Sequence, residues 1–317
     1  MKFELTILGC NSAIPANNRF PTAQVLNVRG HLYLIDCGEG TQIRLRDNRI
    51  KRSRINQIFI SHLHGDHVFG LIGVLSSYGL NGRKEPLHIY CPPHLDEIIN
   101  LQLKYTGHPL PYLIEFHITD PEKNQLIFED KVVEVFTIPL THRIPTQGFL
   151  FREKQQPDSM IPEKIKKHDI PFQDIQSIKD GNNWINSNGE TITHAELTTP
   201  ASRPRSYAFC SDTSYNESII PIIKGVDLLY HESTFLHSEI EFAERTKHST
   251  TIQAATIAEK AKVGKLILGH YSSRYVELDE LEDEAKTVFP NTELGLEGKR
   301  FEVMMSKTRS KKTRKRK

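Results

Sequence analysis

The most constraining feature of this 317-residue chain is a short cluster of histidine and aspartate that follows an apolar segment. Residues 57–61 (QIFIS) have the apolar character of a buried strand, and the sequence HLHGDH follows directly. Three imidazoles and one carboxylate within six positions suit zinc, which does not require sulfur ligands. Alternate residues of an extended segment point the same way, so His62 and His64 can bind one ion together. Asp66 and His67 lie beyond a glycine, where the chain can turn toward a neighbouring ion.

Further candidate ligands stand just after other apolar segments. His142 follows VEVFTIPLT, Asp212 follows SYAFCS, and His270 follows KLILG. A second metal ion needs ligands from such positions, and the two oxygens of Asp212 make it the natural bridge between two ions. The sequence therefore predicts a two-metal site built from these three residues and the cluster. Six other histidines do not stand with other candidate ligands and are expected to be structural: His31, His88, His94, His108, His117 and His168.

Strand and helix patterns alternate along most of the chain. Apolar or alternating runs predict strands at residues 3–8, 24–28, 31–36, 57–61, 87–90, 114–118, 132–138, 148–151, 206–210, 227–231 and 265–269. Helical periodicity predicts helices at residues 68–80, 95–105, 250–262 and 278–288. Two strand-rich halves joined by helices predict an α/β domain, with two stacked sheets and the helices outside them.

The middle of the chain differs in composition from the rest. Residues 152–202 are polar, contain Pro157, Pro162 and Pro171, and include the stretch KDGNNWINSNGE. Long polar segments with several prolines are uncommon inside a compact core. This composition therefore predicts an insertion or a mobile arm.

The formal net charge of +2 conceals an asymmetry between the body of the chain and its end. Residues 307–317 (KTRSKKTRKRK) hold eight basic residues and no acidic residue, so residues 1–306 are net acidic. A block of like charges repels itself, which predicts a disordered tail that either solubilises the protein or tethers it to phosphate. The chain has no run of 18 apolar residues, no secretory signal pattern and no closely spaced cysteine pair, so we expect a cytoplasmic protein without a membrane span.

The candidate ligands resemble those of the metallo-β-lactamase superfamily in order and approximate spacing, over nearly the whole chain up to about residue 306. Four further motifs are similar to those of the ribonuclease Z family, whose members remove 3′ trailers from precursor tRNA. They are LGCNSAIP with RFPT at 19–22, LIDCGEGTQIRL at 34–45, HEST at 231–234, and KHSTTIQAA at 247–255 ahead of GHYSSRY. The resemblance implies an αββα sandwich of two mixed sheets over residues 1–306, plus a protruding arm that binds tRNA.

The resemblance also implies roles for individual residues. One zinc ion would be held by His62, His64, His142 and Asp212, and the other by Asp66, His67, Asp212 and His270. Asp66 would also accept the proton of the attacking water, and cleavage would leave a 3′-hydroxyl on the tRNA and a 5′-phosphate on the trailer. His248 is the candidate proton donor to the leaving oxygen, with Glu232 holding its ring, although both can instead belong to a helix cap and a polar surface.

Several polar residues are candidate contacts for the RNA: Ser272, Ser273 and Arg274 after the last metal ligand, and Lys164, Lys166 and Lys167 in the arm. The first three can position phosphate or simply form a polar turn. The arm has Pro171-Phe172 where short members of the family usually carry a Gly-Pro pair.

Three functions are consistent with the sequence. The resemblance favours a zinc-dependent endoribonuclease that processes the 3′ end of precursor tRNA as a homodimer. The alternative is a phosphodiesterase or esterase of the same fold that acts on a small substrate. A non-catalytic RNA-binding relative is disfavoured, because all seven predicted ligand positions are filled.

Overall fold

The computed structural model describes residues 2–106 and 109–305, so the basic tail at 307–317 lies outside the described residues. The chain forms two compact units. One unit runs to Arg152 and resumes at Arg205, and the other spans Glu153–Pro204. The sequence predicted an insertion at residues 152–202. None of the helices within residues 2–106 and 109–305 has the length and apolar composition required to cross a membrane.

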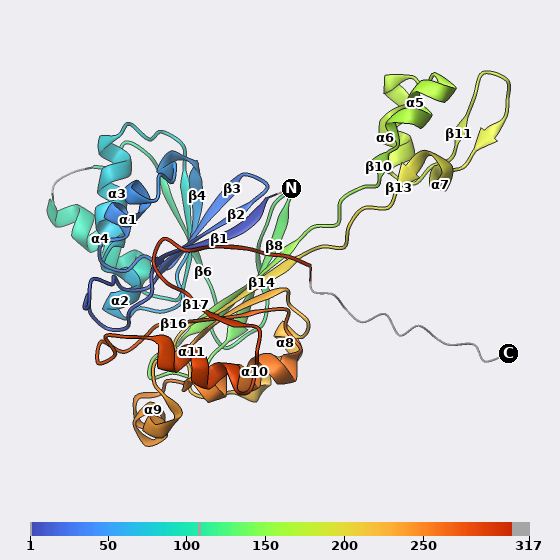
Figure 1. The fold of residues 1–317 in the computed structure, drawn as a ribbon. Coiled ribbons are helices and arrows are strands. Elements are labelled where there is room, and N and C mark those ends of the chain that lie inside the picture. The colour runs from blue at the N-terminus through green and yellow to red at the C-terminus, as the bar shows by residue number, and fades with distance from the viewer. Residues whose placement is uncertain (1, 107–108, 306–317) are drawn as a thin grey trace, which may run out of the picture. The chain divides into compact units, whose positions relative to one another are not determined.

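The described part of the larger unit contains two sheets of seven strands each (Figure 1). The first sheet has the order β18-β1-β2-β3-β4-β5-β6, and β3 to β6 run parallel. Its strands are β1 Phe3–Gly9, β2 Ala23–Val28, β3 His31–Ile35, β4 Ile55–Phe59, β5 Leu87–Cys91, β6 Ile114–Ile118 and β18 Arg300–Glu302.

The second sheet has the order β17-β16-β15-β14-β9-β8-β7, and β14 to β17 run parallel. Its strands are β7 Leu126–Glu129, β8 Val133–Pro139, β9 Gln147–Glu153, β14 Ser206–Cys210, β15 Leu228–Glu232, β16 Leu266–Gly269 and β17 Thr292–Leu294. The sequence patterns did not predict β7, β17 and β18. These strands are three or four residues long, too short for an alternating pattern to stand out.

The two sheets pack face to face through the apolar side chains on their inner faces. Phe3 and Phe59 of the first sheet share one buried cluster with Phe149 and Phe209 of the second. Helices cover the two outer faces (Figure 1). They are α1 Thr41–Asp47, α2 Gly65–Val68, α3 Leu71–Leu80 and α4 Leu95–Thr106 on the first sheet, and α8 Ile220–Ile223, α9 Ile240–Thr246, α10 Thr251–Ala261 and α11 Asp279–Lys286 in the second half. This layering confirms the predicted α/β sandwich.

The helix predicted at residues 68–80 is interrupted in the structure. The segment forms α2 and α3, with a break at Gly70. The amide of Gly70 donates a hydrogen bond to the carbonyl oxygen of Cys37 at 2.9 Å. A Cβ atom at this position would lie 2.1 Å from the carbonyl oxygen of Gly38, so only glycine fits this close approach. The contact holds the loop after β3 against the segment that carries the histidine cluster.

The smaller unit has secondary structure and a core of its own. Its elements are β10 Ser159–Met160, α5 Pro162–His168, α6 Phe172–Lys179, β11 Trp184–Ile185, β12 Thr191–Ile192, α7 His194–Leu197 and β13 Thr198–Thr199. Ile170, Ile178 and Leu197 are buried together, with Trp184 packed against them. The chain enters this unit after β9 and leaves it before β14, and these two strands are antiparallel partners with Arg152 opposite Ser206.

Candidate metal centre

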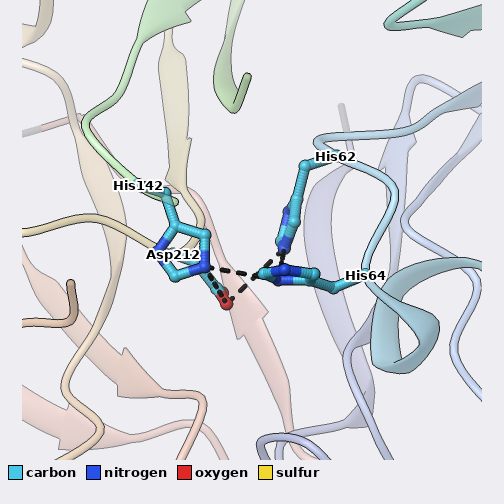
Figure 2. Close-up of side chains that lie close together, drawn as sticks. All are labelled: His62, His64, His142 and Asp212. Atoms are coloured by element: carbon cyan, nitrogen blue, oxygen red, sulfur yellow. Dashed lines mark hydrogen bonds and ion pairs between the residues drawn. The ribbon is translucent and has the colours of Figure 1, made fainter. Parts of the chain in front are cut away.

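Two groups of side chains converge beyond the ends of the strands. The first group consists of His62, His64, His142 and Asp212, whose ligand atoms all lie within 4.8 Å of one another. Figure 2 shows the three imidazole rings and the carboxylate pointing toward one another. Nδ1 of His64 lies 3.0 Å from Nε2 of His62 and 3.3 Å from Nε2 of His142. Oδ2 of Asp212 lies 3.6 Å from Nε2 of His62 and 3.8 Å from Nε2 of His142.

The second group consists of Asp66, His67, Asp212 and His270, within the same limit of 4.8 Å. Oδ1 of Asp212 lies 3.3 Å from Nε2 of His67 and 3.2 Å from Nε2 of His270. Oδ2 of Asp66 lies 3.5 Å and 3.3 Å from the same two nitrogen atoms. The two oxygens of Asp212 therefore face different groups, which is the arrangement that a carboxylate bridging two ions requires.

The distances in both groups suit tetrahedral metal coordination. In a tetrahedron with zinc–nitrogen bonds of about 2.0–2.1 Å, neighbouring ligand atoms are about 3.3 Å apart. Nε2 of His67 is buried and has no hydrogen-bond partner among the described residues, although carboxylate oxygens lie nearby. A cation at this point would bind that nitrogen and offset the negative charge around it. The donor set therefore fits a metal ion.

The fold brings these ligands together because each follows the end of a strand. His62 and His64 follow β4, and Asp66 and His67 lie in α2. The others follow strands of the second sheet: His142 after β8, Asp212 after β14 and His270 after β16. His270 has a φ of 60°, in the left-handed region that non-glycine residues seldom adopt. Strained backbone of this kind persists where the surrounding structure enforces it, often at functional sites.

Metal binding requires neutral imidazole and ionised carboxylate, and most groups around the centre meet this requirement. His67 is the exception: burial lowers its pKa, but the carboxylates of Asp212, Asp66 and Asp36 outweigh burial and raise that pKa well above its ordinary value, so this ring must release a proton when a cation binds. Burial and the neighbouring His67 lower the pKa of His62 well below its ordinary value. Burial alone would raise the pKa of Asp212. The surrounding imidazoles, first among them His270, outweigh this effect and hold that pKa well below its ordinary value.

The carboxylate of Asp36 holds the ring of the candidate ligand His67, and Asp36 was not among the residues selected from the sequence. Its Oδ2 accepts hydrogen bonds from Nδ1 of His67 at 2.7 Å and from the hydroxyl of Ser61 at 2.8 Å. Its Oδ1 accepts one from the amide of Ser61 at 2.8 Å. A carboxylate on Nδ1 fixes the ring and leaves Nε2 free to bind a metal. Asp36 stands directly after β3, so the rule that selected Asp212 could also have found it.

Replacing Asp36 with asparagine should weaken metal binding by about 10- to 100-fold, the range typical of outer-shell partners. Asparagine keeps the size of the side chain but removes the charge that holds the His67 ring. Metal retained per chain against graded concentrations of a chelator measures the effect. The control is Asp120→Asn, which alters a partly exposed carboxylate paired with Lys123. Equal retention by Asp36→Asn and wild type would show that this carboxylate does not support the ligands.

His248, which is partly exposed, and the buried Glu232 form a pair beside the two groups. Nδ1 of His248 donates a hydrogen bond to Oε1 of Glu232 at 2.8 Å. Glu232 also accepts hydrogen bonds from the amides of Thr213 at 3.0 Å and Thr234 at 3.1 Å, so it joins three loops. Burial lowers the pKa of His248, but the Glu232 carboxylate outweighs burial and raises it to about 9. The ring of His248 therefore carries a proton at neutral pH.

A cavity of about 320 Å³ gives access to both groups. It is lined by Ser12, Ala13, His64, Gly65, Asp66, Phe69, His142, Arg143, Asp212, His248 and His270. Sequence analysis missed Ala13, whose amide donates to Oδ2 of Asp66 at 2.7 Å, and also Phe69 and Arg143. Ala13 lies within the motif LGCNSAIP, which carried the family resemblance without a role for this residue, whereas Phe69 and Arg143 lie outside the quoted motifs.

The other predicted contacts are not among the described residues that line this cavity. The guanidinium of Arg274 donates to Glu239 at 2.6 Å and lies over the rings of Phe235 and Phe242. Ser272 and Ser273 lie in the same loop, next to Arg274. The three lysines of the arm lie on α5 of the smaller unit, where Lys164 is half-buried and Lys166 and Lys167 are exposed.

Comparisons with known proteins identify relatives of nearly the whole chain. A family model described as anti-Pycsar protein Apyc1 matches residues 3–153. A protein from Bacteroides fragilis named Ribonuclease Z is 47% identical over 296 residues, which cover 93% of this chain and 97% of that protein. A Ribonuclease Z from Parabacteroides distasonis is 48% identical over 301 residues, covering 95% and 99%.

Solved structures share the fold. The crystal structure of human tRNase Z, short form, has a TM-score of 0.69 and 25% identity, covering 95% of this chain and 99% of that one. The metallo-β-lactamase fold protein YhfI from Bacillus subtilis has a TM-score of 0.68 at 18% identity, covering 95% and 98%. The two stacked sheets with outer helices are thus a metallo-β-lactamase fold. Given its identity to the curated relatives over nearly their full length, the chain belongs to the ribonuclease Z family.

Proposed function

We propose that this protein is a zinc-dependent endoribonuclease that removes 3′ trailers from precursor tRNA. The observation that carries the proposal is the position of Asp212, whose two oxygens face two separate ligand groups 3.2–3.8 Å away. A two-metal site of this kind suits the in-line cleavage of a phosphodiester. The RNA substrate is supported by the relatives named Ribonuclease Z and by the likeness to tRNase Z.

The proposed reaction divides two proton transfers between residues of this chain. Two zinc ions at the centre would lower the pKa of a water molecule and neutralise charge on the scissile phosphate. Asp66 accepts the proton of the water whose oxygen bonds to phosphorus. The bond from phosphorus to the 3′ oxygen breaks, and His248 donates a proton to that oxygen. The tRNA thereby keeps a 3′-hydroxyl and the trailer carries a 5′-phosphate.

Glu232 acts in this proposal as a positioning residue. Its carboxylate holds Nδ1 of His248 at 2.8 Å, which leaves Nε2 of that ring free to donate. It also raises the pKa of His248, so the donor is loaded with a proton at neutral pH. The amides of Thr213 and Thr234 donate hydrogen bonds to the same carboxylate. The bond from Thr213 fixes the position of the pair relative to the loop that carries Asp212.

A comparison of two substrates tests the proposed function directly. The wild-type protein with bound zinc is given a precursor tRNA and, separately, bis-p-nitrophenyl phosphate. We expect cleavage of the precursor at the base of the trailer, with a 3′-hydroxyl on the tRNA. Hydrolysis of the small ester without cleavage of the precursor would instead establish the alternative, a phosphodiesterase for small substrates.

The smaller unit is proposed as the tRNA-binding arm. Its helix α5 carries Lys164, Lys166 and Lys167, and the ring of Phe172 at the start of α6 is 90% exposed. Basic side chains next to an exposed aromatic ring are typical of surfaces that bind nucleic acid. We propose that the lysines contact backbone phosphates of the tRNA. Ser272, Ser273 and Arg274 are proposed as further phosphate contacts outside the cavity.

Replacing Lys164, Lys166 and Lys167 together with glutamine should weaken tRNA binding and flatten its salt dependence. The slope of log K against log salt should fall by about one unit for each lysine that binds a phosphate in the wild type. Binding measured at several salt concentrations gives this slope. The matched control replaces the same lysines with arginine, which keeps the charge and should keep the slope. An unchanged slope in the glutamine variant would remove these lysines from the interface.

Three further features complete the proposal. A homodimer is proposed, and the mass of the protein in solution tests it. A domain boundary near residue 306 is proposed, with the basic tail beyond it. The cytoplasm is proposed as the location, in keeping with four free and buried cysteines at positions 10, 37, 91 and 210.

A further inference from the structure

A third cluster of potential metal ligands lies at the edge of the first sheet, outside the metal centre. It consists of His88 on β5 together with Glu115 and His117 on β6. Both histidines were expected to be structural, because neither stands in a cluster of candidate ligands in the sequence. They lie 29 residues apart in the chain. The structure brings them together, since β5 and β6 are neighbouring strands.

The register of the two strands explains why these side chains meet. β5 and β6 are parallel, with His88 opposite Glu115 and Tyr90 opposite His117. Side chains alternate along a strand, so these four residues share one face of the sheet. Tyr90 belongs to the cluster buried between the two sheets, which places this face toward the second sheet. β6 is the last strand of its sheet, so the cluster lies at an open margin of the sandwich.

The three ligand atoms converge on one point. Nδ1 of His88 lies 3.1 Å from Nε2 of His117 and 3.3 Å from Oε2 of Glu115. These values match the separation of about 3.3 Å between neighbouring ligands of a tetrahedral zinc ion. A proton on Nδ1 of His88 can form a well-aligned hydrogen bond with only one of its two neighbours, Nε2 of His117 or Oε2 of Glu115. A single cation would satisfy all three atoms at once.

The surroundings of the cluster favour metal binding further. The ring of Tyr90 stacks on the ring of His117, with 4.4 Å between centroids and 10° between planes, and so fixes the plane of this ligand. The side chains of His88 and Glu115 are 30% and 40% exposed, which leaves a path for an ion and room for water as a fourth ligand.

We infer that His88, Glu115 and His117 form an additional site for zinc. Two imidazoles and one carboxylate form a ligand set that suits zinc better than it suits magnesium or calcium, which favour oxygen ligands. The ion would link β5 to β6 and so stabilise the outermost pair of strands in this sheet. The site is separate from the proposed reaction and does not depend on it.

The test compares zinc content in the full-length wild type and in the double variant His88→Gln/His117→Gln. After dialysis against micromolar free zinc, the double variant should hold one zinc ion fewer per chain. Its cleavage of precursor tRNA should match that of the wild type, which also shows that it folds. Added zinc should raise the melting temperature of the wild type more than that of the variant, because the ion binds the folded state.

Two further variants make the test specific. Glu115→Gln keeps the size of the side chain and should also lose the additional ion. His94→Gln removes an imidazole from an exposed pair, in which His94 lies 3.0 Å from Glu97 with no third ligand among the described residues, and should keep it. Equal zinc content in the wild type and the double variant would overturn the inference. An equal loss in His94→Gln would do so as well, since it would reveal unspecific binding to surface histidines.

Discussion

The Asp212→Asn variant should cleave precursor tRNA more than about 100-fold more slowly than the wild type. This loss exceeds the one that replacing an outer-shell partner of a metal ligand usually causes. Asp212 supplies one oxygen to each ligand group, at 3.2 and 3.3 Å on one side and 3.6 and 3.8 Å on the other. An amide offers only one uncharged oxygen, so one group loses its oxygen ligand and both groups lose the negative charge they share. His64→Ala alters only the first group. We therefore expect Asp212→Asn to retain less metal per chain than His64→Ala, as measured by elemental analysis.

The comparison between these variants separates a bridging role from a general loss of structure. Asparagine has nearly the same size as aspartate, and Asp212 makes its main contacts with imidazoles of the centre. Circular dichroism at matched zinc concentration should therefore show a folded Asp212→Asn protein. The control Asp120→Asn should keep both its metal and its activity. Full activity of Asp212→Asn with two ions bound would falsify the bridging role.

His248→Ala should reduce the cleavage of precursor tRNA by about 10²- to 10⁴-fold, the range typical of general acid catalysis. The 3′ oxygen of a ribose is a poor leaving group unless it receives a proton. p-Nitrophenolate leaves without one. The same variant should therefore hydrolyse bis-p-nitrophenyl phosphate at nearly the wild-type rate. Single-turnover rates on the two substrates provide the measurement.

Two controls support the interpretation of His248→Ala. His31→Ala removes another histidine that lies beside a carboxylate, 3.4 Å from Asp130, and should cleave both substrates normally. Glu232→Gln should show the same substrate-dependent loss as His248→Ala, because it removes the charge that keeps the donor protonated. An equal loss on both substrates in His248→Ala would assign the ring a structural role.

The layered fold could be predicted from the sequence because its central strands carry long apolar runs. The patterns at residues 206–210 and 265–269 correspond to β14 and β16. The candidate ligands were found by the same logic, since Asp212 and His270 directly follow such runs. The break at Gly70 could not be predicted, because it depends on the approach of a loop 32 positions earlier in the chain, around Gly38.

The groups that sequence analysis missed are those whose role depends on the partner that the fold provides. Asp36 directly follows β3, where the rule of polar residues at strand ends could have found it, but its contact with His67 arises only because β3 and β4 are neighbouring strands. His88 and His117 acquire neighbours only through the register of β5 and β6. The core of the smaller unit could not be predicted either, because Ile170, Ile178 and Leu197 are too widely spaced in the sequence to form a periodic pattern.

The way in which the smaller unit joins the sheet has a consequence for how this family can diversify. Arg152 and Ser206 face each other across one antiparallel ladder, so everything between them is topologically an enlarged hairpin connection. The entropy of closing such a connection grows only with the logarithm of its length. Whole segments can therefore be exchanged there at small energetic cost, while the seven candidate ligands stay in place. Under the proposed function, the part of the chain that selects the RNA and the part that cleaves it can therefore change independently of each other.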